Sequence, residues 1–402
     1  MMLKNTLLKI VQEQKAEISK KDEGIKREAL KNIDTDIIYT TIISGIRRCG
    51  KSTLLRQIIS KRKNYNYFNF EDPRAIDFEL QDFEKLEEVF LEINGKTSYY
   101  FFDEIQNISG WERQIRKLHD NKACIFITGS NASLLSKELG TKLTGRYIIH
   151  ELYPFSYQES LRLTKQKDSI KAFESYLNKG GFPDFLKYEK IEILQQIFKD
   201  IILKDIIVRY KLRDAKTIQE LATYLISNAG KQVSYNKLKT QFGLGSANSI
   251  INYIKYFEDS YLMFTIPLFS YSLKQQIVNP KKIYAVDTGL ATANSASFSE
   301  DKGRVLENFV YLTLRKKNKV YYFKKKKECD FILQNKDKII NAIQVCYELN
   351  EGNQAREIEG LTEALETLNL KEGMIITYNQ EEKIEVNGKK ISVLPVRKWL
   401  LS

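Results

Sequence analysis

The octapeptide Gly45-Ile46-Arg47-Arg48-Cys49-Gly50-Lys51-Ser52 decides the fold of the first half of this chain. It fits the pattern G-x-x-x-x-G-K-[ST]. A run rich in β-branched residues, 37–44, precedes it, and a helical pattern of apolar residues follows it. Strand, loop and helix in this order form phosphate-binding loops, so the sequence predicts an α/β domain with a parallel sheet and such a loop at a strand end.

The residue types of this Walker A loop predict a site for ATP and Mg²⁺. The glycines let consecutive N–H groups wrap closely around phosphates, Lys51 neutralises the outer phosphates, and the Ser52 hydroxyl is a Mg²⁺ ligand. Further residues of the loop and first helical turn are expected to contact the nucleotide: Gly45, Arg47, Arg48, Cys49, Gly50 and Thr53.

A second acidic motif follows the apolar strand predicted at 98–102, where the chain continues with Asp103 and Glu104. Neighbouring side chains on a strand point in opposite directions, so the two carboxylates are predicted to have different tasks. Asp103 would hold Mg²⁺ as a Walker B residue, and Glu104 would polarise the attacking water. Alone, such a pair is more often a helix cap; downstream of the loop it indicates a catalytic pair.

A further predicted strand, 123–128, leads into Gly129, Ser130 and Asn131. In P-loop ATPases with a strand inserted between the two motif strands, a polar side chain at this strand's tip lies beside the γ-phosphate. Ser130 and Asn131 are the candidates for that sensor. The alternative is a turn followed by a helix N-cap.

These motifs resemble those of a large group of bacterial and archaeal AAA-type ATPases that carry a C-terminal domain of unknown function with a nuclease-like fold. The segments that carry the resemblance are 45–55, 101–106, 128–131, 145–146, 152–155 and 180–183. The resemblance covers most of the chain. It implies an ATPase core, a winged-helix middle and a restriction-nuclease-like end.

Arg146, just before the strand predicted at 147–152, is placed where AAA-type ATPases carry an arginine that reaches the nucleotide of a neighbouring subunit. This position makes Arg146 a candidate catalytic residue and a homo-oligomer a candidate assembly. A surface salt bridge is the competing interpretation.

A chain of 402 residues is expected to hold several domains. β-rich runs alternate with helical patterns up to residue 155, and helical patterns then dominate as far as 212. The predicted division is a helical leader at 1–33, the ATPase domain at 34–155, a helical connector or lid at 156–212, a winged-helix domain at 213–290 and a smaller mixed α/β nuclease-like domain at 295–402.

Composition limits the function further. The formal net charge of +13 makes DNA a plausible partner, although solvated lysines on an ordinary surface would give the same number. Four scattered cysteines and two histidines argue against a zinc site or a disulfide framework. The N-terminus lacks a secretory pattern and no apolar run is long enough to span a membrane, so a cytoplasmic protein without membrane contact is expected.

The middle of the chain predicts helices at 214–227, 234–242 and 246–259, in a helix-turn-helix layout. On the third helix, the helical spacing predicts a core face of Ala247, Ile250, Ile251 and Ile254 and an outward face of Asn248, Asn252 and Lys255. Strands at 261–267 and 282–286 would form a wing, with Lys274, Lys281 and Lys282 near phosphates. Binding of DNA and binding of a protein partner remain equally open.

In the C-terminal region, Glu307 on a predicted helix and Asp330 at a strand start match two metal ligands of a restriction-type nuclease. Such an enzyme also needs a glutamate and a lysine two residues apart on the next strand, where this chain has Gln344 and Cys346. One carboxylate and the cation are therefore expected to be missing, which favours binding or scaffolding over cleavage.

The leading hypothesis is an ATPase whose nucleotide cycle changes the contacts of its C-terminal domains with DNA. The alternative is a slow-turnover nucleotide switch that recruits an unknown protein partner, and an ATP-dependent nuclease is the least favoured.

Overall fold

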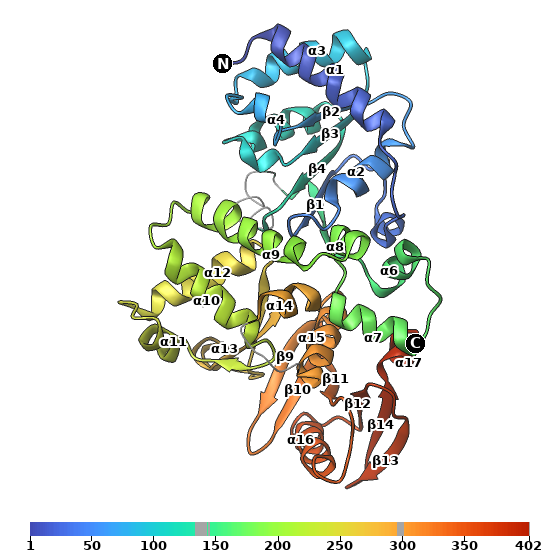
Figure 1. Ribbon diagram of the computed structural model, residues 1–402, viewed down its shortest axis with the longest axis vertical. Helices are drawn as coiled ribbons and strands as arrows, with labels where there is room; N and C mark the ends of the chain where they lie inside the picture. The colour runs from blue at the N-terminus through green and yellow to red at the C-terminus, as the bar shows by residue number, and fades with distance from the viewer. Residues whose placement is uncertain (133–142, 144, 296–300, 402) are drawn as a thin grey trace. The chain divides into compact units, whose positions relative to one another are not determined.

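The computed structural model describes residues 1–132, 143, 145–295 and 301–401 (Figure 1). The chain divides into two compact units. Unit 1 comprises 1–166, 182–188 and 259–261, and unit 2 comprises 167–181, 189–258 and the chain from 262 onwards. The segment after the Gly180–Gly181 pair therefore belongs to unit 1, although the glycines belong to unit 2.

Unit 1 is built on a parallel sheet with the strand order β2-β3-β4-β1-β5. Its strands are β1 (Thr40–Gly45), β2 (Asn66–Asn69), β3 (Tyr99–Asp103), β4 (Cys124–Gly129) and β5 (Tyr147–Leu152). As predicted, β4 is inserted between the two motif strands β1 and β3. Parallel strands present their carboxyl ends at one edge, so the segments after β1, β3 and β4 meet there.

The predicted first strand begins too early. β1 starts at Thr40, which pairs with Ile125 of β4 and Tyr147 of β5, while Ile38 and Tyr39 are exposed. β-branched and aromatic residues favour strands, but without neighbours in register these two residues have no sheet to join.

The helices of unit 1 are α1 (Lys4–Lys20), η1 (Glu28–Asn32), α2 (Lys51–Ile59), η2 (Pro73–Ala75), α3 (Asp82–Asn94), η3 (Ile105–Asn107), α4 (Trp111–Asp120), α6 (Tyr157–Thr164) and α8 (Pro183–Tyr188). Helix α1 runs beside α3 (Figure 1) and buries Leu7 and Ile10 in the same apolar cluster as Ile42 and Phe102 of the sheet. The N-terminal leader is thus part of the core of unit 1.

The first part of unit 2 is helical around a small antiparallel sheet of order β6-β8-β7. Its elements are α7 (Ile170–Lys179), α9 (Ile191–Asp200), the π-helix η5 (Ile201–Val208), α10 (Ala215–Ser227), β6 (Gln232–Val233), α11 (Tyr235–Gln241), α12 (Ala247–Asp259), β7 (Met263–Pro267), α13 (Leu273–Val278), β8 (Lys281–Ala285) and α14 (Thr288–Asn294).

The core face predicted for α12 is wrong at one residue, Ile251. Ile250, Ile254 and Phe257 are buried, whereas Ile251 is 42% exposed. The buried residues follow the spacing i, i+4, i+7, and Ile251 lies about 100° around the helix from Ile250, beyond the edge of that stripe. Asn248, Asn252 and Lys255 are exposed, as predicted.

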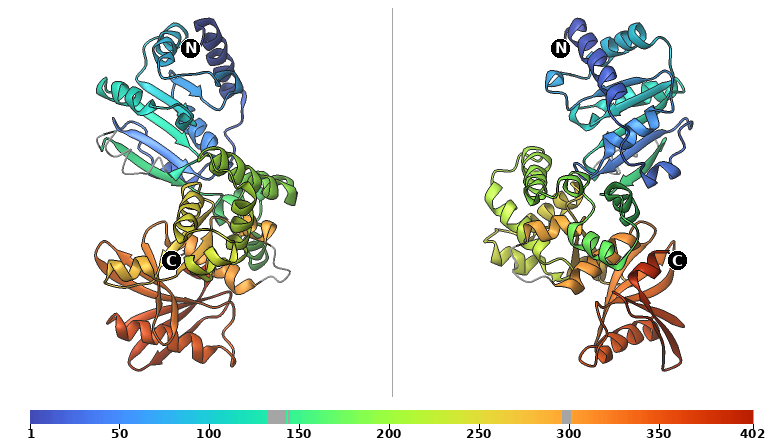
Figure 2. Two further views of the ribbon diagram at one scale, coloured as in Figure 1. Left: turned by 90° about the vertical axis from the view of Figure 1, so that its left-hand side faces the viewer. Right: turned by 45° about the vertical axis from the view of Figure 1, so that its right-hand side comes forward.

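The second part of unit 2 is a mixed sheet with the order β13-β14-β12-β11-β10-β9. Its elements are α15 (Lys302–Leu314), β9 (Lys319–Lys324), β10 (Glu328–Asn335), β11 (Lys338–Val345), α16 (Gln354–Thr367), β12 (Glu372–Thr377), β13 (Glu382–Val386), β14 (Lys389–Pro395) and α17 (Val396–Leu401). Helix α16 packs against this sheet (Figure 2), and its Leu361 and Leu365 share a core with Ile332 and Ile375.

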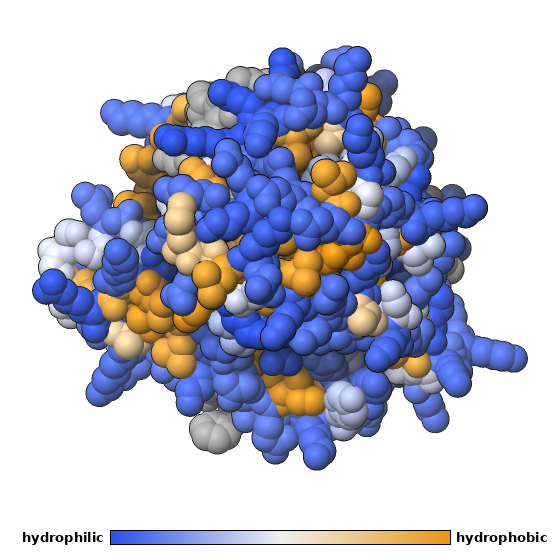
Figure 3. Space-filling view, turned by 90° about the horizontal axis from the view of Figure 1, so that it is seen from above, coloured by the Kyte–Doolittle hydropathy of each residue, from blue (hydrophilic) through white to orange (hydrophobic). Residues whose placement is uncertain are grey.

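The face in Figure 3 is mostly hydrophilic, and apolar side chains form smaller patches among the charged ones. No helix within the described residues is long and apolar enough to cross a membrane.

Candidate functional site

The loop between β1 and α2 needs its two motif glycines. A Cβ atom on Gly45 would lie 2.0 Å from the carbonyl oxygen of Leu152 on the neighbouring strand β5. Gly50 has φ +99°, a backbone conformation that is strained for any residue with a side chain. Close packing fixes the first glycine, and the left-handed turn into the helix fixes the second.

Helix α2 begins at Lys51 directly after Gly50, which has no side chain that could cap it. In any α-helix the first N–H groups point back along the axis and have no partner within the helix, so here they face the loop, where with the helix dipole they form a binding site for an anion. This donor set fits the phosphates of a nucleotide.

Lys51 supplies the cation of this loop. Its side chain is buried, and Nζ donates to the carbonyl oxygens of Gly45 at 3.2 Å and Ile46 at 3.3 Å. Nζ also lies 3.3 Å from Oε1 of Glu104. Burial by itself lowers the pKa of Lys51, but the Glu104 and Asp103 carboxylates outweigh it and raise that pKa above its ordinary value. Lys51 is therefore charged at neutral pH.

Asp103 and Glu104 are both buried at the end of β3, with different partners. Asp103 accepts hydrogen bonds from the hydroxyls of Thr128 and Ser52. Glu104 has a left-handed backbone with φ +53°, pairs with Lys51, and accepts a hydrogen bond from the Ser130 N–H at 3.2 Å. The turn at Glu104 thus gives the adjacent carboxylates separate surroundings.

The electrostatics of the two carboxylates differ as well. Burial and the neighbouring Glu104 raise the pKa of Asp103, whereas for Glu104 the effect of burial is outweighed by Lys51, which lowers its pKa. A hydroxyl and a carboxylate oxygen in hydrogen-bond contact, from Ser52 and Asp103, are the hard ligands that Mg²⁺ takes, so these residues fit that ion.

The structure brings Ser130 and Asn131 to the same edge. Both are buried at the end of β4, and the Ser44 hydroxyl donates to the Asn131 carbonyl oxygen at 3.1 Å. Together with the bond from the Ser130 N–H to Glu104, this contact ties the tip of β4 to both motif strands.

The outer residues of the loop make contacts of their own. Arg47 pairs with Glu71 at 2.7 Å, and the exposed Arg48 lies 3.5 Å from Asp184 of α8. Cys49 is buried, and Thr53 is half-buried on the first turn of α2.

Arg146 lies at the opposite edge of the sheet. The next residue, Tyr147, pairs with Thr40 at the start of β1, whereas the loop follows the end of β1. The Arg146 side chain is 51% exposed and pairs with Asp120 at 2.8 Å. Arg146 therefore takes no part in the site of its own chain, and a role toward a neighbouring chain remains a prediction.

Two residues of this site were not predicted from the sequence. The Thr128 hydroxyl donates to the Asp103 carboxylate and accepts from the Glu104 backbone N–H at 3.0 Å, so it joins the tip of β4 to both acidic residues. Arg27, only 3% exposed, donates to the Cys49 carbonyl oxygen at 2.6 Å and to the Glu159 carboxylate at 2.9 Å. Thr128 was readable as the residue before Gly129, but no local signal marks Arg27.

The C-terminal pair Glu307 and Asp330 does meet in unit 2, with an unexpected partner. Lys282, predicted to lie near phosphates, is instead buried, with Nζ 3.1 Å from Glu307 and 2.8 Å from Asp330. The prediction that Lys282 lies near phosphates is wrong, because its ammonium is buried among carboxylates. The cation expected to be absent from this cluster thus comes from β8.

Gln344 and Cys346 lie in the same region, where Gln344 forms hydrogen bonds and Cys346 is an uncharged thiol. Gln344 accepts from the Asp330 N–H at 3.1 Å and donates to the buried Glu357 at 2.5 Å. Burial raises the pKa of the Cys346 thiol to about 11, so this thiol is neutral at physiological pH. Glu357, on α16, is a further carboxylate that was not predicted from the sequence.

Comparisons with known proteins agree with the architecture of unit 1. Residues 39–161 match the family described as AAA domain, and residues 170–301 and 302–399 match two domains of unknown function, DUF8612 and DUF4143. Among solved structures, AMPPCP-bound DnaA from Aquifex aeolicus is 17% identical and covers 57% of this chain and 85% of that chain. Its TM-score of 0.29 is too low to add to the assignment.

Several relatives match nearly the whole chain, and two of them are at least 30% identical to it. An uncharacterized protein of Methanocaldococcus jannaschii is 38% identical over 96% of this chain and 93% of its own length. An uncharacterized protein of Haemophilus influenzae is 31% identical over 96% of this chain and 99% of its own length. The chain therefore belongs to a family of archaeal and bacterial AAA-type P-loop ATPases that carry C-terminal domains of unknown function.

Proposed function

We propose that this protein hydrolyses ATP and uses the nucleotide cycle to change the contacts of its C-terminal domains with DNA. The observation that supports hydrolysis best is the sheet order, in which β4 separates β1 from β3. This order gathers Lys51, Glu104 and Ser130 at one edge, joined by the contacts described above.

Each residue has a distinct role in this proposal. Lys51 and the N–H groups at the start of α2 bind the phosphates, while Ser52 and Asp103 hold Mg²⁺, which neutralises charge on the phosphates when bound. Glu104 orients and polarises the attacking water, its carboxylate held by the Ser130 N–H. Ser130 and Asn131 sense the γ-phosphate, and Arg146 would act on the nucleotide of a neighbouring chain.

The domains of unit 2 supply the proposed DNA contacts. The element order α10-β6-α11-α12-β7-α13-β8 supports a winged-helix domain at 213–290, with the short helix α13 between the two strands of the wing. Asn248, Asn252 and Lys255 are exposed on α12. The mixed sheet with Glu307 and Asp330 supports a nuclease-like domain at 295–402. Its exposed lysines are suited to phosphates: Lys316, Lys317, Lys319, Lys324, Lys325, Lys326 and Lys327.

The decisive measurement is steady-state ATP hydrolysis with and without single- and double-stranded DNA. Turnover that rises with DNA, and that disappears in Glu104→Gln, is the expected result. Turnover that is unchanged over a wide range of DNA concentrations would remove DNA from the proposal while leaving the ATPase assignment in place.

A second candidate function is a nucleotide switch that recruits a protein partner. A specific observation favours it: the segment between β7 and β8 exposes Tyr271 at 86%, Leu273 at 69%, Ile277 at 63% and Val278 at 69%. Apolar side chains are suited to a protein surface and not to phosphates. A stoichiometric bound nucleotide with slow turnover and no DNA effect would support this alternative.

A further inference from the structure

The ammonium group of Lys282 in unit 2 is surrounded by carboxylates. Nζ lies 2.8 Å from Oδ1 of Asp330, 2.9 Å from Oε1 of Glu328 and 3.1 Å from Oε1 of Glu307, and the Lys282 side chain is 3% exposed. The lysine comes from β8, and the carboxylates come from α15 and β10. Carboxylate oxygens from separate elements thus converge on one cation, as they do around a bound metal.

Further hydrogen bonds hold two of these carboxylates, those of Asp330 and Glu307, in place. Oδ2 of Asp330 accepts a hydrogen bond from the Val345 N–H at 3.0 Å, and Oε1 of Glu307 accepts one from the Tyr284 hydroxyl at 2.7 Å. These bonds orient Asp330 and Glu307 toward the ammonium. A charge buried in this way is stable only because its counter-charges are in place.

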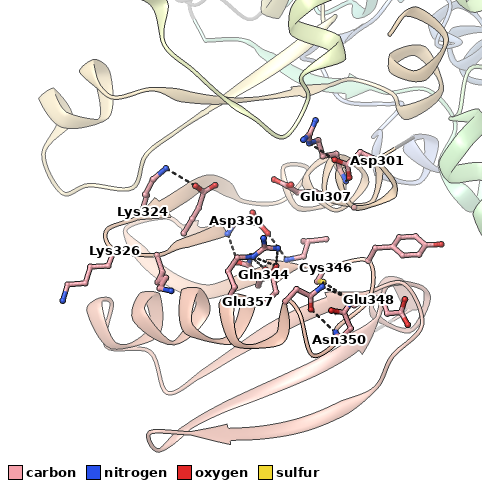
Figure 4. A pocket seen from close by; sticks show the side chains of 18 residues that line it. Asp301, Glu307, Lys324, Lys326, Asp330, Gln344, Cys346, Glu348, Asn350 and Glu357 are labelled. Atoms are coloured by element: carbon pink, nitrogen blue, oxygen red, sulfur yellow. Dashed lines mark hydrogen bonds and ion pairs between the residues drawn. The ribbon is translucent and has the colours of Figure 1, made fainter. Parts of the chain in front are cut away.

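The cluster forms one wall of a pocket of about 800 Å³. Figure 4 shows Glu307 on its helix above the strand residue Asp330, with Gln344 and Glu357 beyond, and Lys324 and Lys326 to one side. Glu307, Glu328 and Asp330 line this pocket, while Lys282 is not among its lining residues. The ammonium therefore sits on the inner side of the carboxylates.

A divalent metal does not fit this cluster. Its ligands would be the carboxylate oxygens that already contact Lys282, and its charge would lie close to the buried ammonium. With Lys282 in place, no group of three or more His, Cys, Asp and Glu residues within the described parts of the chain is arranged to hold a metal ion. The nuclease-like resemblance implies a metal here, and the residues present disagree with it.

We propose that the Lys282 ammonium is the resident cation of the Glu307, Glu328 and Asp330 cluster, so that divalent metal binds there only when Lys282 is removed. Lys282 belongs to the segment that matches one domain of unknown function, 170–301, and the carboxylates belong to the other, 302–399. The cation site therefore takes residues from both matched segments.

The test is a Mn²⁺ titration in which electron paramagnetic resonance measures how much Mn²⁺ is bound. All variants carry Asp103→Asn and contain no nucleotide, so that the ATP site does not contribute. Lys282→Met should bind one Mn²⁺ per chain, at concentrations at which the parent binds none. Adding Asp330→Asn should abolish this binding, and Lys274→Met, an exposed lysine of α13, should behave like the parent.

Two results would overturn the proposal: stoichiometric Mn²⁺ in the parent that Asp330→Asn removes, or a folded Lys282→Met that binds no Mn²⁺. If Lys282→Met does not fold alone, refolding with and without Mn²⁺ replaces the titration. Recovery of folded protein only with Mn²⁺ supports the proposal, and failure in both conditions counts against it, because the metal then does not replace the ammonium. Neither result depends on whether the protein hydrolyses ATP.

Discussion

Lys51 is the residue on which phosphate binding depends most directly. Replacing it with alanine removes the cation that the loop carbonyls and Glu104 position. We expect Lys51→Ala to abolish productive ATP binding, with a loss of at least about 2–3 kcal/mol in binding free energy. Titration with a fluorescent ATP analogue measures it, with the exposed Lys61→Ala as the matched control. Undiminished affinity in Lys51→Ala would contradict the role of the loop.

Glu104 separates binding from hydrolysis. In Glu104→Gln, the side-chain oxygen can still accept from the Ser130 N–H, but a neutral amide polarises water poorly. ATP affinity should stay within a few-fold, while kcat falls by about 10²- to 10⁴-fold. Phosphate release and nucleotide titration on one preparation measure both quantities, and normal turnover would assign the catalytic role elsewhere.

Arg27 holds the loop from the N-terminal leader. Its guanidinium joins the Cys49 carbonyl oxygen, the Tyr153 carbonyl oxygen and the Glu159 carboxylate, all within unit 1. Arg27→Met leaves Glu159 buried without this cation, so we expect a loss of about 3–5 kcal/mol in the free energy of unfolding. Adding Glu159→Gln should recover part of that loss. Urea unfolding of the single and double variants measures these changes in the free energy of unfolding. Equal stability of Arg27→Met and the parent would show that the Arg27–Glu159 pair does not stabilise the fold.

At the scale of elements, the end of α7 is fixed by a contact with α14. Gly180 has φ +70°, and a Cβ atom there would lie 2.1 Å from Oδ1 of Asp287. Asp287 in turn accepts from the N–H groups of Gly181 at 2.7 Å and Leu290 at 2.8 Å. The glycine therefore serves both the turn and the close packing of the two helices.

Gly180→Ala should accordingly destabilise unit 2 by at least about 2 kcal/mol, from backbone strain plus displacement of the Asp287 carboxylate. Gly95 is a matched control, since it ends α3 with nearly the same backbone angles, φ 65° and ψ −163° against φ 70° and ψ −160°, and a Cβ atom there would have no atom of another part of the chain within 4 Å. Urea unfolding of both variants isolates the contact: equal losses would mean that Asp287 moves aside without cost.

For the whole molecule, the exposed lysines lead us to expect DNA binding, whereas the Lys282 cluster leads us to expect no DNA cleavage. With Mg²⁺ or Mn²⁺ and ATP, plasmid and linear DNA should stay intact, because an ammonium occupies the carboxylate cluster. DNA should nevertheless be retained in a salt-sensitive way, with the salt slope falling by about 0.9 for each phosphate contact removed when Lys324 to Lys327 are neutralised.

Filter binding over a salt series, together with gel analysis of the DNA, tests both statements. Cleavage that disappears in Asp330→Ala would contradict the inactive assignment. Binding that is indifferent to salt and to the four lysines would leave the protein-partner alternative as the better account.

The sequence by itself determined the sheet of unit 1 and the position of its nucleotide-binding motifs. Each signal is local: the spacing of Gly45, Gly50 and Lys51, the apolar strand before Asp103, and the strand before Ser130. Local signals of this kind follow from strand and helix periodicity and from the backbone freedom of glycine. They also placed three helices of unit 2, α10, α11 and α12, to within one residue at each end.

Only the tertiary structure decided which distant side chains meet. Arg27 lies 22 residues before the Cys49 carbonyl that it holds, and Lys282 lies 48 residues before Asp330. Neither contact has a sequence signal, because a charged residue is read as solvent-exposed until a buried counter-charge is known. The side of α12 that carries Ile251, the register that excludes Tyr39 from β1, and the cation in the C-terminal cluster all depend on packing between elements, which periodicity within one element cannot specify.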